Sequence, residues 1–327
     1  MKHVSILLLN DVNLGSLENA RQGLMKANDF LKSKGKKAAF QIELVGLTAD
    51  VKLSKGLYDV HVDKILTETP KTDMVIIPPV QNDLLESIKS NQEFIPWIIE
   101  QYNEGAEVVS LCLGAFILGN TGLLNGKDCV THWQAAPQFQ QLFPKARLMP
   151  DKLLTDEDRI YTGGGAFSCA NLILYIIEKH IGREASIFCS KIFQIDMGRN
   201  SQTPFIIFTG QKDHADEEIR TLQEHLEKNY QEKISVDELS RNYGIGRRSL
   251  ERRFKKATGN TVIEYFQRVK VEAAKRELEK GFKTISEVMF DVGYSDHKSF
   301  RNVFRKYSGM SPADYKTKYV NEPLLVG

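Results

Sequence analysis

The sequence predicts an α/β domain, a parallel sheet with helices on both faces, followed by an all-α domain with two helix-turn-helix motifs joined by a long helix. Over about the first 195 residues, continuous apolar runs alternate with amphipathic helices, as in strands buried within a parallel sheet. Near the C-terminus, short amphipathic segments punctuated by glycines repeat about fifty residues apart. Charge is also uneven, because residues 1–233 carry 25 Lys and Arg against 30 Asp and Glu, whereas residues 234–320 carry 19 against 11. A basic end of this kind suits contact with nucleic acid.

The elements expected in the first half follow one another closely. They are strand 3–9, helix 17–34, strand 38–46, strand 73–78, helix 83–103, strand 107–111, short strands with the turn TGGGAF at 162–167, and helices 168–181 and 184–195. Residues 198–212 read as a linker, because they are polar at both ends and broken by Pro204. We therefore expect a first domain at 1–197, a second at 213–320 and a tail at 321–327.

One stretch of the first half carries chemistry. In SLCLGAF, a buried strand ends in Cys112, and Gly114 and Ala115 allow a tight turn into a helix. This is the layout of a nucleophile elbow, in which a reactive side chain sits on a strained turn. At such a turn the helix dipole can lower a thiol pKa, and the Leu113 N–H can face a bound oxyanion. His132 is a candidate partner for the thiol.

Together with the GLLNGK turn, THW and TGGG, this elbow resembles the ThiJ/PfpI superfamily, a class-I glutamine amidotransferase-like group with a flavodoxin-like α/β fold. The resemblance covers roughly residues 1–195. It implies that, in the catalytic relatives, a cysteine at the position of Cys112 works with a histidine near His132 and an acidic residue after the first strand.

Two departures from that pattern argue against catalysis. The acidic position falls near Ser16, with Glu18 two residues away, and the glycine pair after the third strand reads Pro79-Val80. Proline has no N–H to offer an oxyanion, and losing one such donor costs about 10²–10³ in rate. We therefore expect no catalytic residues, with Cys112 and His132 as vestigial candidates. The expected ligand-pocket residues are Ser16, Pro79, Cys112, Leu113, His132 and Gly164.

The second half contains a helix-turn-helix at residues 284–312. An apolar stripe ends at Gly293, and Asp296 can cap a second helix whose exposed face carries basic and polar side chains. Residues 234–259 repeat the arrangement: Ile234, Gly244, Leu250, Phe254 and Gly259 correspond to Ile285, Gly293, Phe300, Phe304 and Gly309. A helix over 262–278 joins the copies, so both recognition helices could enter successive major grooves.

Residues 214–320 resemble the DNA-binding domain of AraC/XylS-type transcription regulators, including the closing Gly309, Pro312 and Tyr315. Met289 departs from the small residue usual there, which implies local repacking. The whole chain resembles the GlxA-like regulators, which join this domain to a ThiJ/PfpI-like one. The expected DNA contacts are Arg247, Arg248, Glu251 and Arg252 on the first recognition helix, and His297, Lys298, Arg301 and Asn302 on the second.

Other features limit the compartment and the chemistry. The four cysteines form no CxxC pair, no run of ligands has metal spacing, and no apolar run is long enough to span a bilayer. The N-terminus does not read as a signal peptide. We expect a cytoplasmic protein that needs neither a metal nor a cofactor and does not contact membranes.

The expected function is sequence-specific transcription regulation, with activation as one possible outcome. The expected partners are promoter DNA, a small-molecule effector in the degenerate pocket, a second copy of the chain as a homodimer, and RNA polymerase. Two alternatives stay open at this point. One is a cysteine-dependent hydrolase or amidase with an attached basic domain, and the other is an oxidant sensor acting through Cys112.

Overall fold

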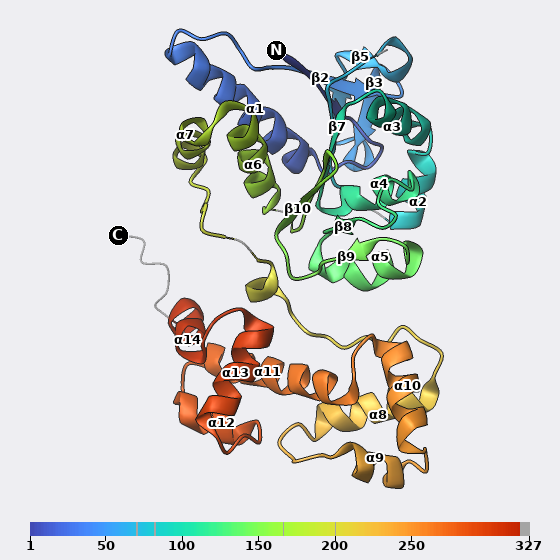
Figure 1. Ribbon diagram of the computed structural model, residues 1–327, viewed down its shortest axis with the longest axis vertical. Coiled ribbons are helices and arrows are strands. Elements are labelled where there is room, and N and C mark those ends of the chain that lie inside the picture. Colours follow the sequence, from blue (N-terminus) through green and yellow to red (C-terminus); the bar gives the residue numbers. More distant parts are fainter. Residues whose placement is uncertain (70, 82, 166, 200, 321–327) are drawn as a thin grey trace. The chain divides into compact units, whose positions relative to one another are not determined.

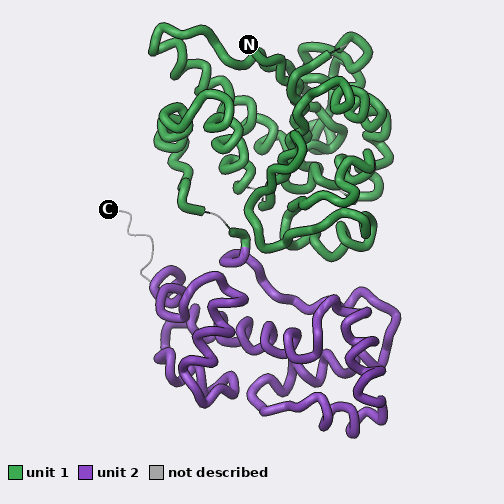
Figure 2. Tube along the Cα trace, viewed as in Figure 1, with its two compact units in different colours: residues 1–202 green, residues 203–327 purple. Residues whose placement is uncertain are grey.

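The computed structural model divides the chain into two compact units (Figure 2). Unit 1 is Met1–Gln202 and unit 2 begins at Thr203, so the boundary falls inside the segment expected to be a linker. The structure describes residues 1–69, 71–81, 83–165, 167–199 and 201–320. The expected tail at 321–327 lies outside these residues.

Unit 1 is built on a seven-stranded sheet with the order β10-β11-β7-β6-β1-β2-β5. All neighbouring strands are parallel except β10 and β11. The strands are β1 (Lys2–Leu7), β2 (Phe40–Gly46), β5 (Lys64–Ile65), β6 (Met74–Ile77), β7 (Glu107–Leu111), β10 (Leu154–Glu157) and β11 (Ile160–Gly163). Two smaller pairs are β3 (Asp50–Leu53) with β4 (Tyr58–His61), and β8 (Asp128–Cys129) with β9 (Arg147–Leu148).

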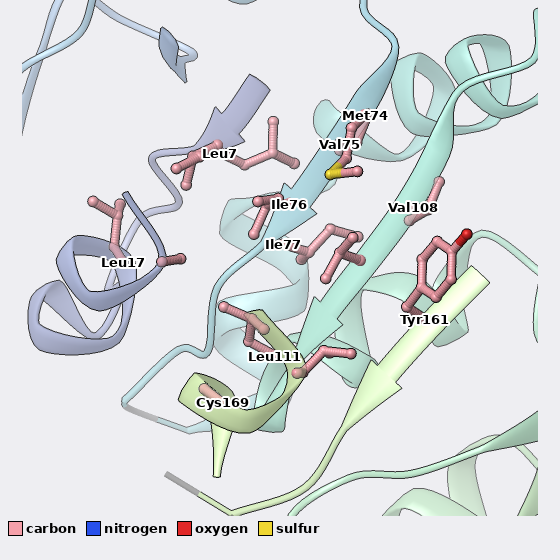
Figure 3. Close-up of a cluster of buried hydrophobic side chains, with 14 of the residues drawn as sticks. Leu7, Leu17, Met74, Val75, Ile76, Ile77, Val108, Leu111, Tyr161 and Cys169 are labelled. Carbon is pink, nitrogen blue, oxygen red and sulfur yellow. The ribbon is translucent and has the colours of Figure 1, made fainter. Parts of the chain in front are cut away.

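Helices cover both faces of this sheet, which confirms the predicted layering (Figure 1). One face carries α1 (Leu14–Ser33), α6 (Cys169–Ile181) and α7 (Arg183–Phe193), and the other carries α2 (Leu84–Ser90), α3 (Phe94–Asn103) and α4 (Ala115–Asn120). A further helix is α5 (Ala136–Leu142). Strands β6 and β7 are buried along their whole length, as their continuous apolar runs predict. Figure 3 shows part of this core, with side chains from the sheet, Leu17 from α1 and Cys169 from α6.

The single helix predicted over 83–103 is wrong, because the structure breaks it into α2 and α3. Asn91 lies at the break and is fully buried. Its side chain accepts from the Asn10 N–H at 2.8 Å and donates to the Asn10 carbonyl at 3.1 Å, so it bonds to the loop after β1. The new helix also places Pro96 in its first turn, where a missing N–H costs nothing.

Unit 2 is all helical across its described residues. Its helices are α8 (Glu217–Lys228), α9 (Val236–Asn242), α10 (Arg247–Thr258), α11 (Val262–Lys280), α12 (Ile285–Asp291), α13 (His297–Ser308) and α14 (Pro312–Val320). One hydrophobic core joins α8, α9 and α10 to the first half of α11, and another joins α12, α13 and α14 to its second half. Met289 is fully buried in the second core. The helix α11 therefore belongs to both cores.

Lys270 lies on α11 between the two cores and is buried. Its Nζ donates to the carbonyls of Tyr230 at 2.6 Å, Glu232 at 3.0 Å and Val292 at 2.8 Å. Burial lowers the pKa of Lys270 to about 8, so the group stays mostly protonated at pH 7. Because Tyr230 and Glu232 precede α9 and Val292 ends α12, one ammonium group links the two helix-turn-helix motifs. Gly293 permits this close approach, since a Cβ there would lie 2.2 Å from the Gln231 carbonyl oxygen.

We predict that Lys270→Met destabilises unit 2 by about 2–3 kcal/mol, because three carbonyls, including that of the buried Val292, would lose their donor. Lys280→Met, on the same helix but exposed, should cost less than about 0.5 kcal/mol. Both tryptophans, Trp97 and Trp133, lie in unit 1. Denaturant unfolding should therefore shift the helical circular dichroism transition and leave the tryptophan fluorescence transition unchanged. Equal unfolding curves for the two variants would contradict this role of Lys270.

Candidate DNA-binding surface and ligand pocket

The first recognition helix, α10, presents one polar face to solvent. Arg247, Arg248, Glu251 and Arg252 are all exposed, while Leu250 and Phe254 are buried in the first core. Alternation of this kind at helical spacing keeps the arginines on the outside. The structure thus brings the four expected contact residues of this helix onto one face.

Within the free protein, Arg247 already has acidic partners. Its guanidinium lies 3.0 Å from Asp237 of α9 and 3.4 Å from Glu251. Among the described residues, Arg248 and Arg252 form no ion pair. A hollow of ≈ 530 Å³ beside the helix is lined by these two arginines together with Lys255 and Lys256. Arg248 and Arg252 are therefore available to an incoming anionic ligand, as are Lys255 and Lys256 beside them.

The second recognition helix, α13, has the same construction. Asp296 caps it by accepting from the Ser299 N–H at 2.6 Å, which fixes where the helix begins. His297, Lys298, Arg301 and Asn302 are exposed, and Phe300 and Phe304 hold the opposite face in the second core. Figure 1 shows α10 and α13 at opposite ends of α11. With 19 residues at about 1.5 Å each, α11 spans about 28 Å, close to the ~34 Å between successive major grooves on one DNA face.

The elbow in unit 1 has the strained geometry that its sequence predicts. Cys112 directly follows β7 and has a φ of +53°, a left-handed value that is uncommon for residues other than glycine. Gly114 allows the turn because a Cβ there would lie 2.4 Å from the Ile77 carbonyl oxygen. The elbow therefore lies against the end of β6, at the carboxyl edge of the parallel sheet.

A pocket of ≈ 500 Å³ opens at this edge. Chain order reverses between β1 and β6, and open α/β sheets bind ligands at such a point. Five of the six residues expected to form a ligand site line the pocket: Ser16, Pro79, Cys112, Leu113 and His132. Gly164 does not line it and instead lies beside the side chain of Gln202.

Several residues that line the pocket are not among those predicted from the sequence. They are Asn13, Val80, Asp83, Leu84, Gln134, Ala135 and Gln138. Asn13 caps α1 and Asp83 caps α2, each by accepting backbone N–H groups at the start of its helix. A cap residue just after a predicted buried strand could have identified both, because helix N-termini at that edge face the ligand crevice.

The position at the start of a helix does not lower the thiol pKa of Cys112 below its ordinary value. Burial raises the pKa of Cys112 to about 12, and the opposing hydrogen bond from the Leu113 N–H is weaker than this effect. The helix behind the elbow, α4, has only six residues. The thiol is therefore protonated at neutral pH, which disfavours both a nucleophilic and an oxidant-sensing role.

The other groups that catalysis would need, His132, Glu18 and Pro79, form different interactions. The His132 Nδ1 accepts from the Gln134 N–H at 3.2 Å, and burial lowers the pKa of His132, so the ring is neutral at pH 7. Glu18 bonds to Arg21 at 2.7 Å and does not line the pocket. Pro79 contributes its carbonyl, which accepts from the Asn13 N–H at 2.7 Å. This arrangement can hold a small molecule, but it lacks an activated nucleophile.

Two further features concern metal binding and membrane crossing. Among the described residues, no group of three or more His, Cys, Asp or Glu is placed to hold a metal ion. No helix in the described ranges combines the length and apolar content required to cross a membrane.

Comparison with known proteins agrees with both halves of this geometry. Residues 239–318 match the family model of a helix-turn-helix domain, and residues 23–179 match that of the DJ-1/PfpI family. The chain is 27% identical over 318 residues to the HTH-type transcriptional regulator GbdR of Pseudomonas aeruginosa, covering 95% of this chain and 83% of GbdR.

Two more distant relatives match parts of the chain. The HTH-type transcriptional regulator GlxA of Rhizobium meliloti is 22% identical over 221 residues, which cover 65% of this chain and 66% of GlxA. In fold, the crystal structure of Drosophila melanogaster DJ-1beta is similar with a TM-score of 0.50 at 18% identity. That match covers 60% of this chain and 98% of DJ-1beta.

We predict that alkylation of Cys112 by iodoacetamide accelerates with pH up to at least pH 10 without a plateau. A thiol with a pKa of about 12 has about a thousandfold less thiolate at pH 7 than one at 9.0. Alkylation rates are measured by mass spectrometry in the wild type and in Cys112→Ser. Subtracting the Cys112→Ser rate removes the contribution of the other three cysteines. A plateau below pH 8 would show a depressed pKa and would restore the oxidant-sensor alternative.

Proposed function

We propose that this chain, an AraC-type helix-turn-helix protein with an N-terminal DJ-1/PfpI domain, regulates transcription by binding promoter DNA in response to a small molecule. The helices α10 and α13 read the major groove, and the pocket beside Cys112 receives the effector. Effector binding changes DNA binding only if the effector prefers one conformation of the protein over another.

One observation carries the DNA-binding half of this proposal. Two helices of equal length, each with its basic face exposed and its apolar face buried, lie at opposite ends of a shared 19-residue helix. Arginine and asparagine side chains recognise base edges in the major groove, and lysines neutralise phosphates. Arg247 and Glu251 must separate, or move together, before either of them contacts a base.

For the pocket, the observations support binding without turnover. The Cys112 thiol is protonated, Pro79 has no N–H, and Glu18 is held by Arg21. The pocket has room for a molecule of metabolite size, with polar groups from Ser16, His132 and the helix caps on its walls. We infer that an enzyme site of this fold has here become a sensor site.

The remaining partners are part of the same proposal. A homodimer would let two copies engage paired DNA half-sites, and RNA polymerase would be the target of activation. Apolar side chains exposed on α7, Ile192 at 53% and Phe193 at 38%, support a second copy as the neighbour of unit 1. Sedimentation of the full chain measures the oligomeric state directly. We place the protein in the cytoplasm, the compartment of bacterial DNA.

We predict that Arg248→Ala and Lys298→Ala each weaken binding to the cognate operator by about 1–3 kcal/mol, with a smaller effect on random DNA. Lys32 is exposed on α1 of unit 1, so Lys32→Ala removes the same charge far from both recognition helices in sequence and serves as the matched control. The operator can be isolated by selecting bound fragments from genomic DNA, and fluorescence anisotropy then gives the three affinities at one salt concentration.

Two results would change this assignment. Equal losses on operator and random DNA would mean that Arg248 and Lys298 only hold phosphates. Operator affinity that neither variant changes would remove α10 and α13 as the reading helices. In that case the pocket of unit 1 would have to be examined for turnover, with Cys112→Ala as the inactive reference.

A further inference from the structure

The last residue of unit 1, Gln202, has its side chain seated inside that unit and is only 2% exposed. Its amide nitrogen donates to the carbonyls of Thr131 at 3.0 Å, Lys152 at 3.1 Å and Pro150 at 3.4 Å. Its amide oxygen accepts from the Gly165 N–H at 3.0 Å. Every polar group of this amide is thus satisfied, so the seat is specific for glutamine in shape and in hydrogen bonding.

The glycine run TGGG builds this seat. A Cβ on Gly164 would lie 2.2–2.4 Å from three atoms of the Gln202 side chain, closer than real Cβ atoms approach. The backbone at Gly164 must therefore be bare for Gln202 to enter. The motif therefore makes room for the Gln202 side chain at the end of unit 1, whereas the sequence predicts Gly164 as a ligand-pocket residue.

From this seat, two hydrogen bonds lead to the pocket. Gln202 donates to the Thr131 carbonyl, and the Thr131 hydroxyl donates to the Cys112 carbonyl at 3.0 Å. Thr131 is buried and directly precedes His132. Because Cys112 and His132 both line the pocket, a ligand that moves either residue acts on the backbone to which Gln202 is bonded.

On the other side of the Gln202–Thr203 peptide bond, residues 203–208 form a strap clamped onto unit 2. The Lys275 Nζ donates to the Ile206 carbonyl at 2.8 Å, and the Phe208 N–H donates to Glu272 at 3.2 Å. Lys275 and Glu272 also pair with each other at 3.3 Å, and the Lys275 side chain is 5% exposed. The backbone of the strap is therefore held to α11 by the Lys275 ammonium and the Glu272 carboxylate, which also pair with each other within the helix.

The strap also meets the second recognition helix. Gly309 ends α13 in a left-handed conformation, and a Cβ built there would lie 3.2 Å from the Pro204 ring. The Tyr319 hydroxyl of α14 donates to the Pro204 carbonyl at 3.4 Å. A shift of the chain at Thr203 would therefore change the contact between Pro204 and Gly309 at the end of α13.

We propose that Gln202 couples occupancy of the pocket to the position of α13, through the hydrogen bonds to Thr131 and Cys112 on one side and the strap on the other. The coupling element has two states, with the Gln202 amide seated or displaced. This inference rests on the proposed function, because it names how the same pocket regulates DNA binding. A ligand that prefers one state changes operator affinity, and operator DNA changes ligand affinity by the same factor.

The test uses iodoacetamide on Cys112 as a covalent stand-in for a pocket ligand in the full-length protein. Because the buried, protonated thiol reacts slowly at neutral pH, labelling is run to completion at about pH 10, and the protein is returned to neutral pH before binding is measured. Operator affinity is measured before and after complete labelling, with mass spectrometry confirming one adduct that is absent from Cys112→Ser. In the wild-type protein, labelling should change operator affinity about fivefold or more. In Gln202→Glu, labelling should leave the affinity unchanged, because this side chain keeps the shape and can accept from Gly165 but cannot donate to Thr131.

Two further variants make the result independent of one substitution. Gly164→Ala should uncouple the units as Gln202→Glu does, since its methyl group would displace the glutamine amide. Gln92→Glu, exposed in unit 1, is the matched control and should respond to labelling as the wild type does. If the wild type and both uncoupling variants respond equally, the coupling through Gln202 is overturned and the proposed function stands. If labelling has no effect on the wild type, the coupling through Gln202 is likewise overturned, and the proposed function is then judged by the operator affinities of Arg248→Ala and Lys298→Ala.

Discussion

The two DNA-reading motifs depend on one buried ammonium group. Lys270 donates to carbonyls that precede α9 and to the carbonyl that ends α12, and it lies on the helix that both cores share. Apolar packing cannot replace a charge bonded to three backbone oxygens, because these oxygens, including that of the buried Val292, would lose their donor. This constraint fixes the relative placement of α10 and α13, and with it the spacing at which two grooves can be read.

In unit 1 the same balance between burial and charge decides the chemistry of the elbow. The backbone at Cys112 keeps the strained conformation that positions a nucleophile, yet its thiol is buried and protonated. Strain of this kind persists only where the surrounding structure imposes it. Here β6, through the approach of Gly114 to the Ile77 carbonyl, supplies that support. The strained elbow thus forms part of the wall of the pocket.

The segment between the units joins these two halves of the molecule. Sequence composition predicts a linker at 198–212, whereas Gln202 is buried in unit 1 and residues 203–208 are bonded to α11 of unit 2. On each side of the boundary, these described residues are thus hydrogen-bonded to their own unit. In the proposed coupling, a displacement of Gln202 reaches the strap through the peptide bond between Gln202 and Thr203.

Local patterns were sufficient for much of this protein. Apolar periodicity and glycine stops determined α10 and α13 and the exposure of Arg248 and Lys298, since a helix with one apolar stripe must turn its other face to solvent. The strand, cysteine and glycine order likewise determined the elbow at Cys112. Only the tertiary structure decided the break at Asn91, the seat of Gln202 beside Gly164, and the raised thiol pKa. Each of these depends on groups distant in sequence or on the depth of burial, which a local pattern does not encode.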